Sequence, residues 1–457
     1  MNAIFEALSF VDSLFWGYFA FALIFFLGLW MTLGARFFQL RALPSAVGTF
    51  KNCLLKSSGE SRGVHPLKAF FASVGGMIGI GNVVGIVTAV QIGGPGALFW
   101  VWVAAMIGMI IKYSEIYLGL KHRVPNDRGG YDGGPMYFLQ KAFKSRLIPI
   151  FVCTLLCIYG VEIYQFSVIA DSVSSNFSLN KYLVISILLP LVILASVGGV
   201  KRIGQICSLI MPFFVILYVS MGLWVVIQEF STIPAILKSV FISAFSGHAA
   251  VGGFAGSSVL LAIQHGISRA AYSADIGIGY DSIIQSESNV VEPATQGRLA
   301  ILGVCIDNLV CTMSILIVLT TGIWKSTSPI EASLLVQTAL GNYFPFMNLF
   351  MPLFLFIVGY STMIAYFCVG IKCARFLSPE YGMRLYVAYG VSALVFFSFF
   401  DQSHALLVMS LAGAMLLLTN LIGIFKLRGD VDFEIAPNLV LKPSDSASLS
   451  ACAESQL

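Results

Sequence analysis

Long apolar runs separated by short polar segments dominate the chain, and eleven of them are long enough to cross a lipid bilayer. A run of about 20 apolar residues crosses the hydrocarbon core as a helix, because a helix satisfies its own backbone hydrogen bonds. The expected spans are roughly 14–35, 69–92, 97–121, 147–172, 181–198, 202–228, 239–265, 298–322, 346–374, 383–400 and 402–426. The pattern therefore predicts an all-α integral membrane protein with eleven transmembrane helices.

The composition agrees with this interpretation. Of 457 residues, 58% are apolar and 11% are charged, with a mean hydropathy of +0.89, whereas soluble domains carry about a quarter charged residues. A soluble globule is therefore excluded. The 43 glycines and 16 prolines favour helices with breaks over a barrel of alternating strands. The nine cysteines form no CxxC pair, so we expect neither a disulfide framework nor a metal site built on them.

The charge distribution orients the spans. Most of the 26 lysines and arginines fall on one side if the N-terminus lies outside, which is the side that the positive-inside rule assigns to the cytoplasm. The first 35 residues contain no lysine or arginine, so we expect the first apolar segment to remain as a helix rather than act as a signal peptide. The sequence predicts a multi-pass protein of a bacterial cytoplasmic (inner) membrane, with a disordered cytoplasmic tail over 429–457.

The second span contains five glycines within eleven residues, more than a regular helix tolerates, because each costs up to about 1 kcal/mol relative to alanine. Its sequence is SVGGMIGIGNVVGIVTAV. One explanation is close helix packing through small residues. The other is a helix that unwinds at mid-membrane, where freed carbonyls coordinate a cation and a half-helix N-terminus faces a carboxylate. A second glycine-rich interruption follows at SGHAAVGGFAGSS, over residues 246–258. Two broken helices with four spans between them are typical of an inverted repeat of five helices.

Several blocks in order resemble the alanine/glycine:cation symporter family, also called sodium:alanine symporters, within the LeuT-fold (APC superfamily) transporters. The blocks are PLKAFFASVGGMIGIGNVVGIVTAV, GGPGALFWVW with KYSE, YDGGPMYFL, GISRAAYSADIGIG and QGRLAILGVCIDNLVCT. The resemblance implies one N-terminal helix added to a LeuT-like 5+5 inverted repeat. The expected divisions are 1–65 (N-terminal helix and basic loop), 66–228 (first repeat), 229–428 (second repeat) and 429–457 (tail).

The resemblance also implies a function, the import of a small neutral amino acid such as alanine or glycine together with sodium. Sodium is then a co-transported ion, and no cofactor is expected. The residues expected to contact the substrate are Gly79, Ile80, Gly81, Asn82, Gln165, Gly253, Phe254 and Tyr366. In this reading the N–H groups of Gly79–Gly81 bind the substrate carboxylate.

Similarity to the LeuT fold implies a sodium site between the backbone carbonyls of Gly75 and Ile78 and the hydroxyls of Ser361 and Thr362. The alternative for the two hydroxyls is a hydrogen bond to their own helix, four residues back. Sodium requires about five or six oxygen ligands in such a site.

Some positions depart from the family pattern. Tyr366 stands where a tryptophan is usual, and YSADIG replaces FSNEAG, so that Asp275 stands for a glutamate. Glu162 lies one turn from Gln165 where asparagine is common; it is a candidate proton acceptor, an extra cation ligand or a neutral structural acid. Arg269 and Asp275 are expected at the cytoplasmic mouth as a gate. Asp307 is expected to have a buried structural partner, and it is also a candidate coupling residue. Lys112 and Glu115 are expected to form a structural pair.

The closest alternative function keeps the fold and changes the substrate or the coupling ion: a proton-coupled symporter, or a symporter for another amino acid. A channel and a membrane-embedded enzyme are the rivals from other classes. No Ser/His/Asp or His/Glu cluster stands out in the spans, as an enzyme would require. The glycine patterns are not followed by GK[ST], so no nucleotide or nucleic-acid partner is expected. The oligomeric state stays open.

Overall fold

The protein is almost entirely helical in the computed structural model, which describes residues 2–55, 62–246, 259–325 and 332–435. Seven helices in these ranges are long and apolar enough to cross a membrane: Ile4–Gly34, Ala97–Lys121, Leu147–Phe177, Gly199–Gln228, Pro293–Thr321, Met347–Leu377 and Ser403–Lys426. The bent pair Pro66–Met77 and Gly81–Gly93 raises the number to as many as eight. The predicted class of an all-α membrane protein is therefore confirmed.

Helices carry almost all of the secondary structure from end to end. The first part of the chain forms α1 (Asn2–Leu14), the π-helical turn η1 (Phe15–Ala20), α2 (Phe21–Gly34), α3 (Phe38–Leu55), α4 (Pro66–Met77), the π-helical turn η2 (Gly81–Gly85), α5 (Val87–Gly93), α6 (Ala97–Lys121), α7 (Pro135–Phe143), α8 (Leu147–Tyr159), α9 (Ile163–Phe177), α10 (Lys181–Val197) and α11 (Gly199–Gln228). The second part forms α12 (Ile233–Ser246), α13 (Val259–Ser273), α14 (Tyr280–Gln285), α15 (Pro293–Thr321), η4 (Ile323–Lys325), α16 (Ala332–Gly341), α17 (Met347–Leu377), α18 (Gly382–Phe397), α19 (Ser403–Lys426) and η5 (Arg428–Asp430).

The predicted span over 239–265 is described only at its two ends, which belong to α12 (Ile233–Ser246) and α13 (Val259–Ser273). The interruption predicted at Gly247–Gly256, with Gly253 and Phe254, lies outside the described residues. Three apolar helices are shorter than a full span: Lys181–Val197, Ile233–Ser246 and Gly382–Phe397.

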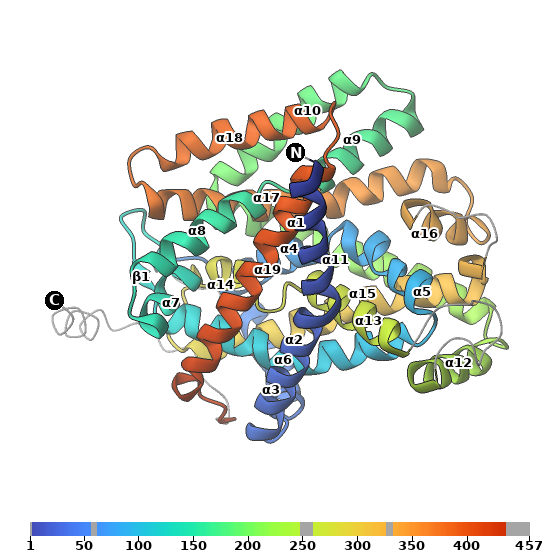
Figure 1. Ribbon diagram of the computed structural model, residues 1–457, viewed down its shortest axis with the longest axis horizontal. Coiled ribbons are helices and arrows are strands. Elements are labelled where there is room, and N and C mark those ends of the chain that lie inside the picture. Colours follow the sequence, from blue (N-terminus) through green and yellow to red (C-terminus); the bar gives the residue numbers. More distant parts are fainter. Residues whose placement is uncertain (1, 56–61, 247–258, 326–331, 436–457) are drawn as a thin grey trace.

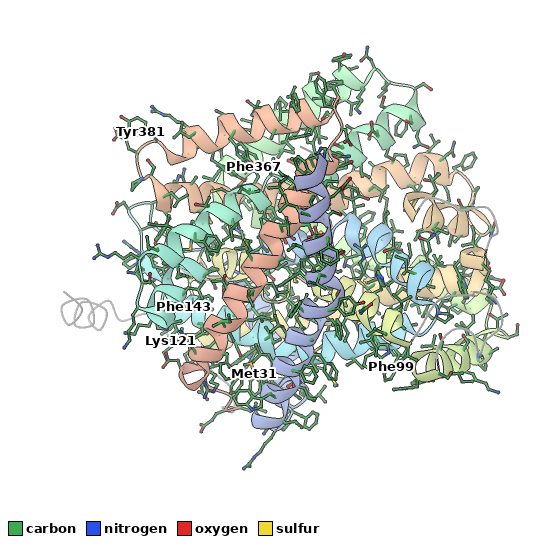
Figure 2. The ribbon with its side chains drawn as sticks, viewed as in Figure 1. Met31, Phe99, Lys121, Phe143, Phe367 and Tyr381 are labelled. Atoms are coloured by element: carbon green, nitrogen blue, oxygen red, sulfur yellow. The ribbon has the colours of Figure 1, made fainter. Side chains whose placement is uncertain are left out.

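Burial separates the central helices from the peripheral ones. In α17, 83% of the most apolar stretch is buried inside the protein, against 22% for the N-terminal helix. The N-terminal segment α1–α2 lies beside the last helix, α19, and both cross the front of the molecule (Figure 1). Phe143, labelled in Figure 2, ends α7. Its ring centroid lies 4.2 Å from the ammonium of Lys426, at the far end of α19. In α6 and α15 the buried shares are 67% and 61%, so these two helices and α17 form the core.

One end of the bundle is tied together by loops. The two-stranded ribbon of β1 (Val124–Pro125) and β2 (Tyr131–Asp132) lies there, and Val64 pairs with Ser288 as an isolated bridge. Arg123 donates to the backbone oxygens of Ser286, Ser288 and Val290 at 2.5–3.1 Å. Burial lowers the pKa of Arg123 to about 10, so its guanidinium is still charged at neutral pH. This single cation fixes the loop after α14 against the end of α6.

Candidate functional site

The glycine-rich second span is broken, as predicted. Helix α4 ends at Met77, Ile78 is extended (φ −82°, ψ 98°), and helical structure resumes at Gly81. The two halves are bent by 47°. None of the glycines from Gly75 to Gly85 has a positive φ. Glycine is required here because it has no side chain: a Cβ on Gly76 would lie 1.7 Å from the Tyr280 hydroxyl.

Two side-chain amides cover backbone N–H groups at this break. The N–H of Gly79 donates to Oδ1 of Asn82 at 3.0 Å, and the N–H of Ile80 donates to Oε1 of Gln165 at 3.3 Å. The sequence predicts that these N–H groups bind a substrate carboxylate; in this structure those of Gly79 and Ile80 are bonded to the two amides. Gly81 differs, because a Cβ built there meets no atom of the described residues within 4 Å. In this part of the chain the open space at the break therefore lies beside Gly81.

An oxygen cluster lies between this break and α17. The Thr362 hydroxyl is 3.2 Å from the Gly75 carbonyl oxygen, 3.4 Å from that of Ile78 and 3.1 Å from that of Val358. A hydroxyl carries a single proton, so it satisfies one of the three carbonyls. The Ser361 hydroxyl donates to Val358 O, three residues back, at 2.8 Å. The contact of Thr362 with Val358 O is the one four residues back that the alternative interpretation expected. The four predicted sodium-site residues are thus brought together.

The structure contains a second break, at Ala274–Gly279, which the sequence analysis did not predict. Helix α13 ends at Ser273 and α14 begins at Tyr280, and every residue from Ser273 to Ser286 is buried. Asp275, Gly277 and Gly279 have φ values of 49°, 77° and 104°, a left-handed region that glycine adopts without strain. The spaced glycines of DIGIG are the signal that could have revealed it.

Side chains on both sides of the first break are hydrogen-bonded to residues beside the second break or share a carboxylate with them. Before the first break, Ser73 donates to Asp281, which follows the second break, at 2.7 Å. After the first break, Asn82 donates to Asp307 on α15 at 2.5 Å, and Ser273, which precedes the second break, donates to the same carboxylate at 3.1 Å. Asp307 therefore joins three elements, as a buried acid with structural partners.

Charged side chains surround the second break. The ammonium of Lys112, on α6, forms an ion pair with Asp281, lies 3.4 Å from Oδ2 of Asp275 and donates to the Asp275 carbonyl at 2.5 Å. Tyr366 donates to the other Asp275 oxygen at 2.9 Å. Glu115 accepts from the Gly277 N–H at 3.1 Å.

The prediction that Asp275 lies at a mouth beside Arg269 is wrong. Asp275 is 0% exposed, because the Lys112 ammonium and the Tyr366 hydroxyl compensate its charge inside the bundle. Arg269 is exposed on α13, and no ion pair joins it to Asp275 in the described part of the chain.

Gln165 and Glu162 also lie at an irregular point, although a continuous helix was expected over 147–172. Helix α8 ends at Tyr159, α9 begins at Ile163, and Glu162 has a φ of 55°. A Cβ on Gly160 would lie 2.9 Å from the Tyr366 carbonyl oxygen, so this glycine permits close contact with α17. Oε2 of Glu162 accepts from the Gln165 amide at 3.2 Å. A chain of contacts therefore runs from Glu162 through Gln165 to the first break.

Tyr366 lies between the two breaks. Its ring stacks on Tyr280 with centroids 4.0 Å apart, and the Tyr280 hydroxyl donates to the Ala72 carbonyl at 3.3 Å. With 5% of its surface exposed, Tyr366 forms an aromatic wall at the centre of α17. Of the residues predicted for the substrate site, Gly79, Ile80, Asn82 and Gln165 are in direct contact, and Tyr366 reaches the same region through Tyr280.

Known proteins resemble this chain in sequence and in fold. The model of the sodium:alanine symporter family matches residues 1–436. An uncharacterised transporter of Haemophilus influenzae is 31% identical over 92% of this chain and 93% of its own length. The sodium/alanine symporter AgcS of Methanococcus maripaludis is 30% identical over 92% and 94%. The crystal structure of MhsT in complex with L-phenylalanine shares the fold, with a TM-score of 0.56, 13% identity and coverage of 80% of this chain and 89% of that one.

Proposed function

Since the chain belongs to the sodium:alanine symporter family, we propose that it is a sodium-coupled symporter that imports a small neutral amino acid, alanine or glycine, by alternating access. It acts as a transporter rather than an enzyme, in a cell membrane. The observation that carries the proposal is the oxygen cluster beside the first break, where two helix halves end in the protein interior.

Sodium binds between α4 and α17 in this proposal. Its ligands are the carbonyl oxygens of Gly75 and Ile78 and the hydroxyls of Ser361 and Thr362. The support is the crowding of three carbonyl oxygens around the one proton of Thr362. A cation neutralises such oxygen–oxygen contacts without requiring a proton, and oxygen is the ligand that hard cations prefer.

The amino acid binds beside Gly81, where the chain leaves open space. The substrate carboxylate accepts hydrogen bonds from the N–H groups of Gly79–Gly81 after the amides of Asn82 and Gln165 move aside. Tyr366 lines the part of the pocket that holds the substrate side chain. Gly253 and Phe254 remain proposed contacts. A pocket built on bare glycine backbone fits a small side chain.

The finer architecture belongs to the same proposal. It comprises eleven spans, with repeats over 66–228 and 229–428, the N-terminus outside and the C-terminus cytoplasmic. Three apolar helices shorter than a full span complete the eleven if tilt or thinning accommodates them. Glu162 and Asp307 are the proposed coupling residues. Glu162 contacts the Gln165 amide and Asp307 the Asn82 amide of the proposed substrate site.

The test is uptake of radiolabelled alanine and glycine into proteoliposomes that contain the full-length protein. An inward sodium gradient should drive accumulation, and an equal choline gradient should not. A second arm imposes a pH gradient without sodium. Accumulation in that arm alone would replace sodium with protons as the coupling ion and point to Glu162. Failure to accumulate any small amino acid in either arm would overturn the proposal.

A further inference from the structure

Four ionisable side chains around the second break are completely removed from solvent. Lys112, Glu115, Asp275 and Asp281 are each 0% exposed. If all four were ionised, three carboxylates would surround one ammonium and leave two uncompensated negative charges in the protein interior. Burial of an unpaired ion costs several kcal/mol even after relaxation. At least one of the carboxyl groups must therefore be neutral.

The hydrogen bonds distinguish the three carboxyl groups. Asp281 receives the Lys112 ammonium and the Ser73 hydroxyl, and Asp275 receives Lys112 and the Tyr366 hydroxyl. Glu115 receives only the Gly277 N–H, on Oε2, while its Oε1 has no donor among the described residues. Glu115 is therefore the carboxyl group with the weakest support for a negative charge.

Ser282 supplies an independent reason. Its side chain lies beside Gly119, one turn along α6 from Glu115, and its hydroxyl proton is already donated to the Gly279 carbonyl at 2.9 Å. Toward Glu115 the serine oxygen is therefore left to accept a hydrogen bond. An acceptor beside a buried carboxyl group matches a protonated acid, which has one O–H to donate.

Among the described residues, Lys112 is the cation that faces Glu115, and no second one does. The charged groups that face it are Lys112 from α6 itself, Asp275 from the break and Asp281 from α14. On α15, Asp307 faces Lys112 from farther away. Lys112 is already shared between the two aspartates.

We propose that Glu115 is a proton-binding site, in which the protonated carboxyl group donates to Ser282 and accepts from the Gly277 N–H, and so holds the second break closed. The proton is a bound ligand of the protein and is separate from the proposed sodium site. Ionisation of Glu115 at alkaline pH places a third negative charge around Lys112. The break then loses its hydrogen bond to Ser282, and both stability and transport decline.

Glu115→Gln tests this, because glutamine mimics the neutral acid in shape and in its ability to donate to Ser282. The first measurement, independent of transport, is the unfolding temperature of the purified protein from about pH 6 to about pH 10. We expect a steeper alkaline decline in the wild type than in Glu115→Gln. Glu292→Gln, the same change at an exposed position, should follow the wild type.

The second measurement rests on the proposed function and uses sodium-driven uptake over the same pH range. Glu115→Gln should keep uptake at neutral pH within about twofold of the wild type and lose the alkaline decline. Parallel unfolding curves for Glu115→Gln and the wild type would overturn the proton site. Absence of uptake by the wild type at every pH would overturn the proposed function instead, and the unfolding curves would still decide the proton site.

Discussion

Both breaks interrupt helical hydrogen bonding inside the protein, and different kinds of side chain compensate for this at each break. At the first break, neutral amides of Asn82 and Gln165 cover the freed N–H groups. At the second, ionisable groups around Lys112 hold an irregular segment. Neutral hydrogen bonds contribute about 1 kcal/mol each, whereas breaking a buried ion pair costs several times more. The first break is therefore suited to exchanging its partners for a ligand, and the second to keeping its shape.

Glycine also serves the two breaks differently. Gly76 at the first break has ordinary backbone angles and is required because Tyr280 occupies the space of a side chain. Gly277 and Gly279 at the second have positive φ values. The first break uses glycine for close approach and open space, and the second uses it for backbone conformation.

The largest effect should come from removing the cation of the second break. Lys112→Met leaves Asp275 and Asp281 buried without an ammonium, which costs about 3–5 kcal/mol, so we expect little folded protein in fluorescence-detected size-exclusion chromatography. Lys121→Met, at the exposed end of the same helix, is the control. Adding Asp281→Asn to Lys112→Met should restore part of the folded fraction. Normal folding of Lys112→Met alone would contradict the distinction between the breaks.

Next in size is the contact where the two breaks meet. Gly76→Ala places a methyl group against the buried Tyr280 ring, and such overpacking costs about 1–3 kcal/mol. We expect a lower unfolding temperature and loss of uptake. Gly85→Ala provides the matched control, because its Cβ meets nothing within 4 Å. Equal unfolding temperatures for the two variants would disprove the close packing of α4 on Tyr280.

At the first break, Thr362→Val should act on sodium more than on folding. It removes one oxygen from the cluster while keeping the shape of the side chain. The loss of about 1.5 kcal/mol for one polar contact with a charge corresponds to about a tenfold higher sodium concentration for half-maximal uptake. Thr362→Ser should remain close to the wild type. An unchanged sodium dependence in the valine variant would remove Thr362 from the proposed site.

The smallest structural effect should accompany Gly81→Ala. Because the added methyl group enters open space, the unfolding temperature should stay within about a degree or two of the wild type, consistent with less than about 0.5 kcal/mol. Uptake of alanine should nevertheless fall more than uptake of glycine, since the methyl group fills the proposed pocket. If both amino acids were transported as well as by the wild type, the pocket would not lie beside Gly81.

The sequence revealed the features that depend on local pattern. Apolar runs predicted helices, and five glycines within eleven residues predicted the first break. The second break was not predicted because Ala274–Gly279 contains only two glycines next to a charge, a pattern that also occurs in exposed loops. Its burial depends on Lys112, which lies 163 residues from Asp275 in sequence. Such a distant partner becomes visible only when the fold brings the two together.

The irregular point at Glu162 could not be predicted for a related reason. The run from Leu147 to Phe177 is continuously apolar enough to be one span, and a glutamate rarely adopts a positive φ. The contact of Gly160 with the Tyr366 carbonyl and the bond between Glu162 and Gln165 accompany that conformation. Both depend on tertiary packing rather than on local propensity.

The pairing of the first helix with the last has a consequence for biosynthesis. Segment α1–α2 lies against α19, whose residues are made some 400 positions later in the chain. During translation the first helix is therefore in the bilayer before α19 exists. Until then its aromatic side chains are stabilised by contact with lipid alone. The front of the molecule can close only after α19 has been made and inserted.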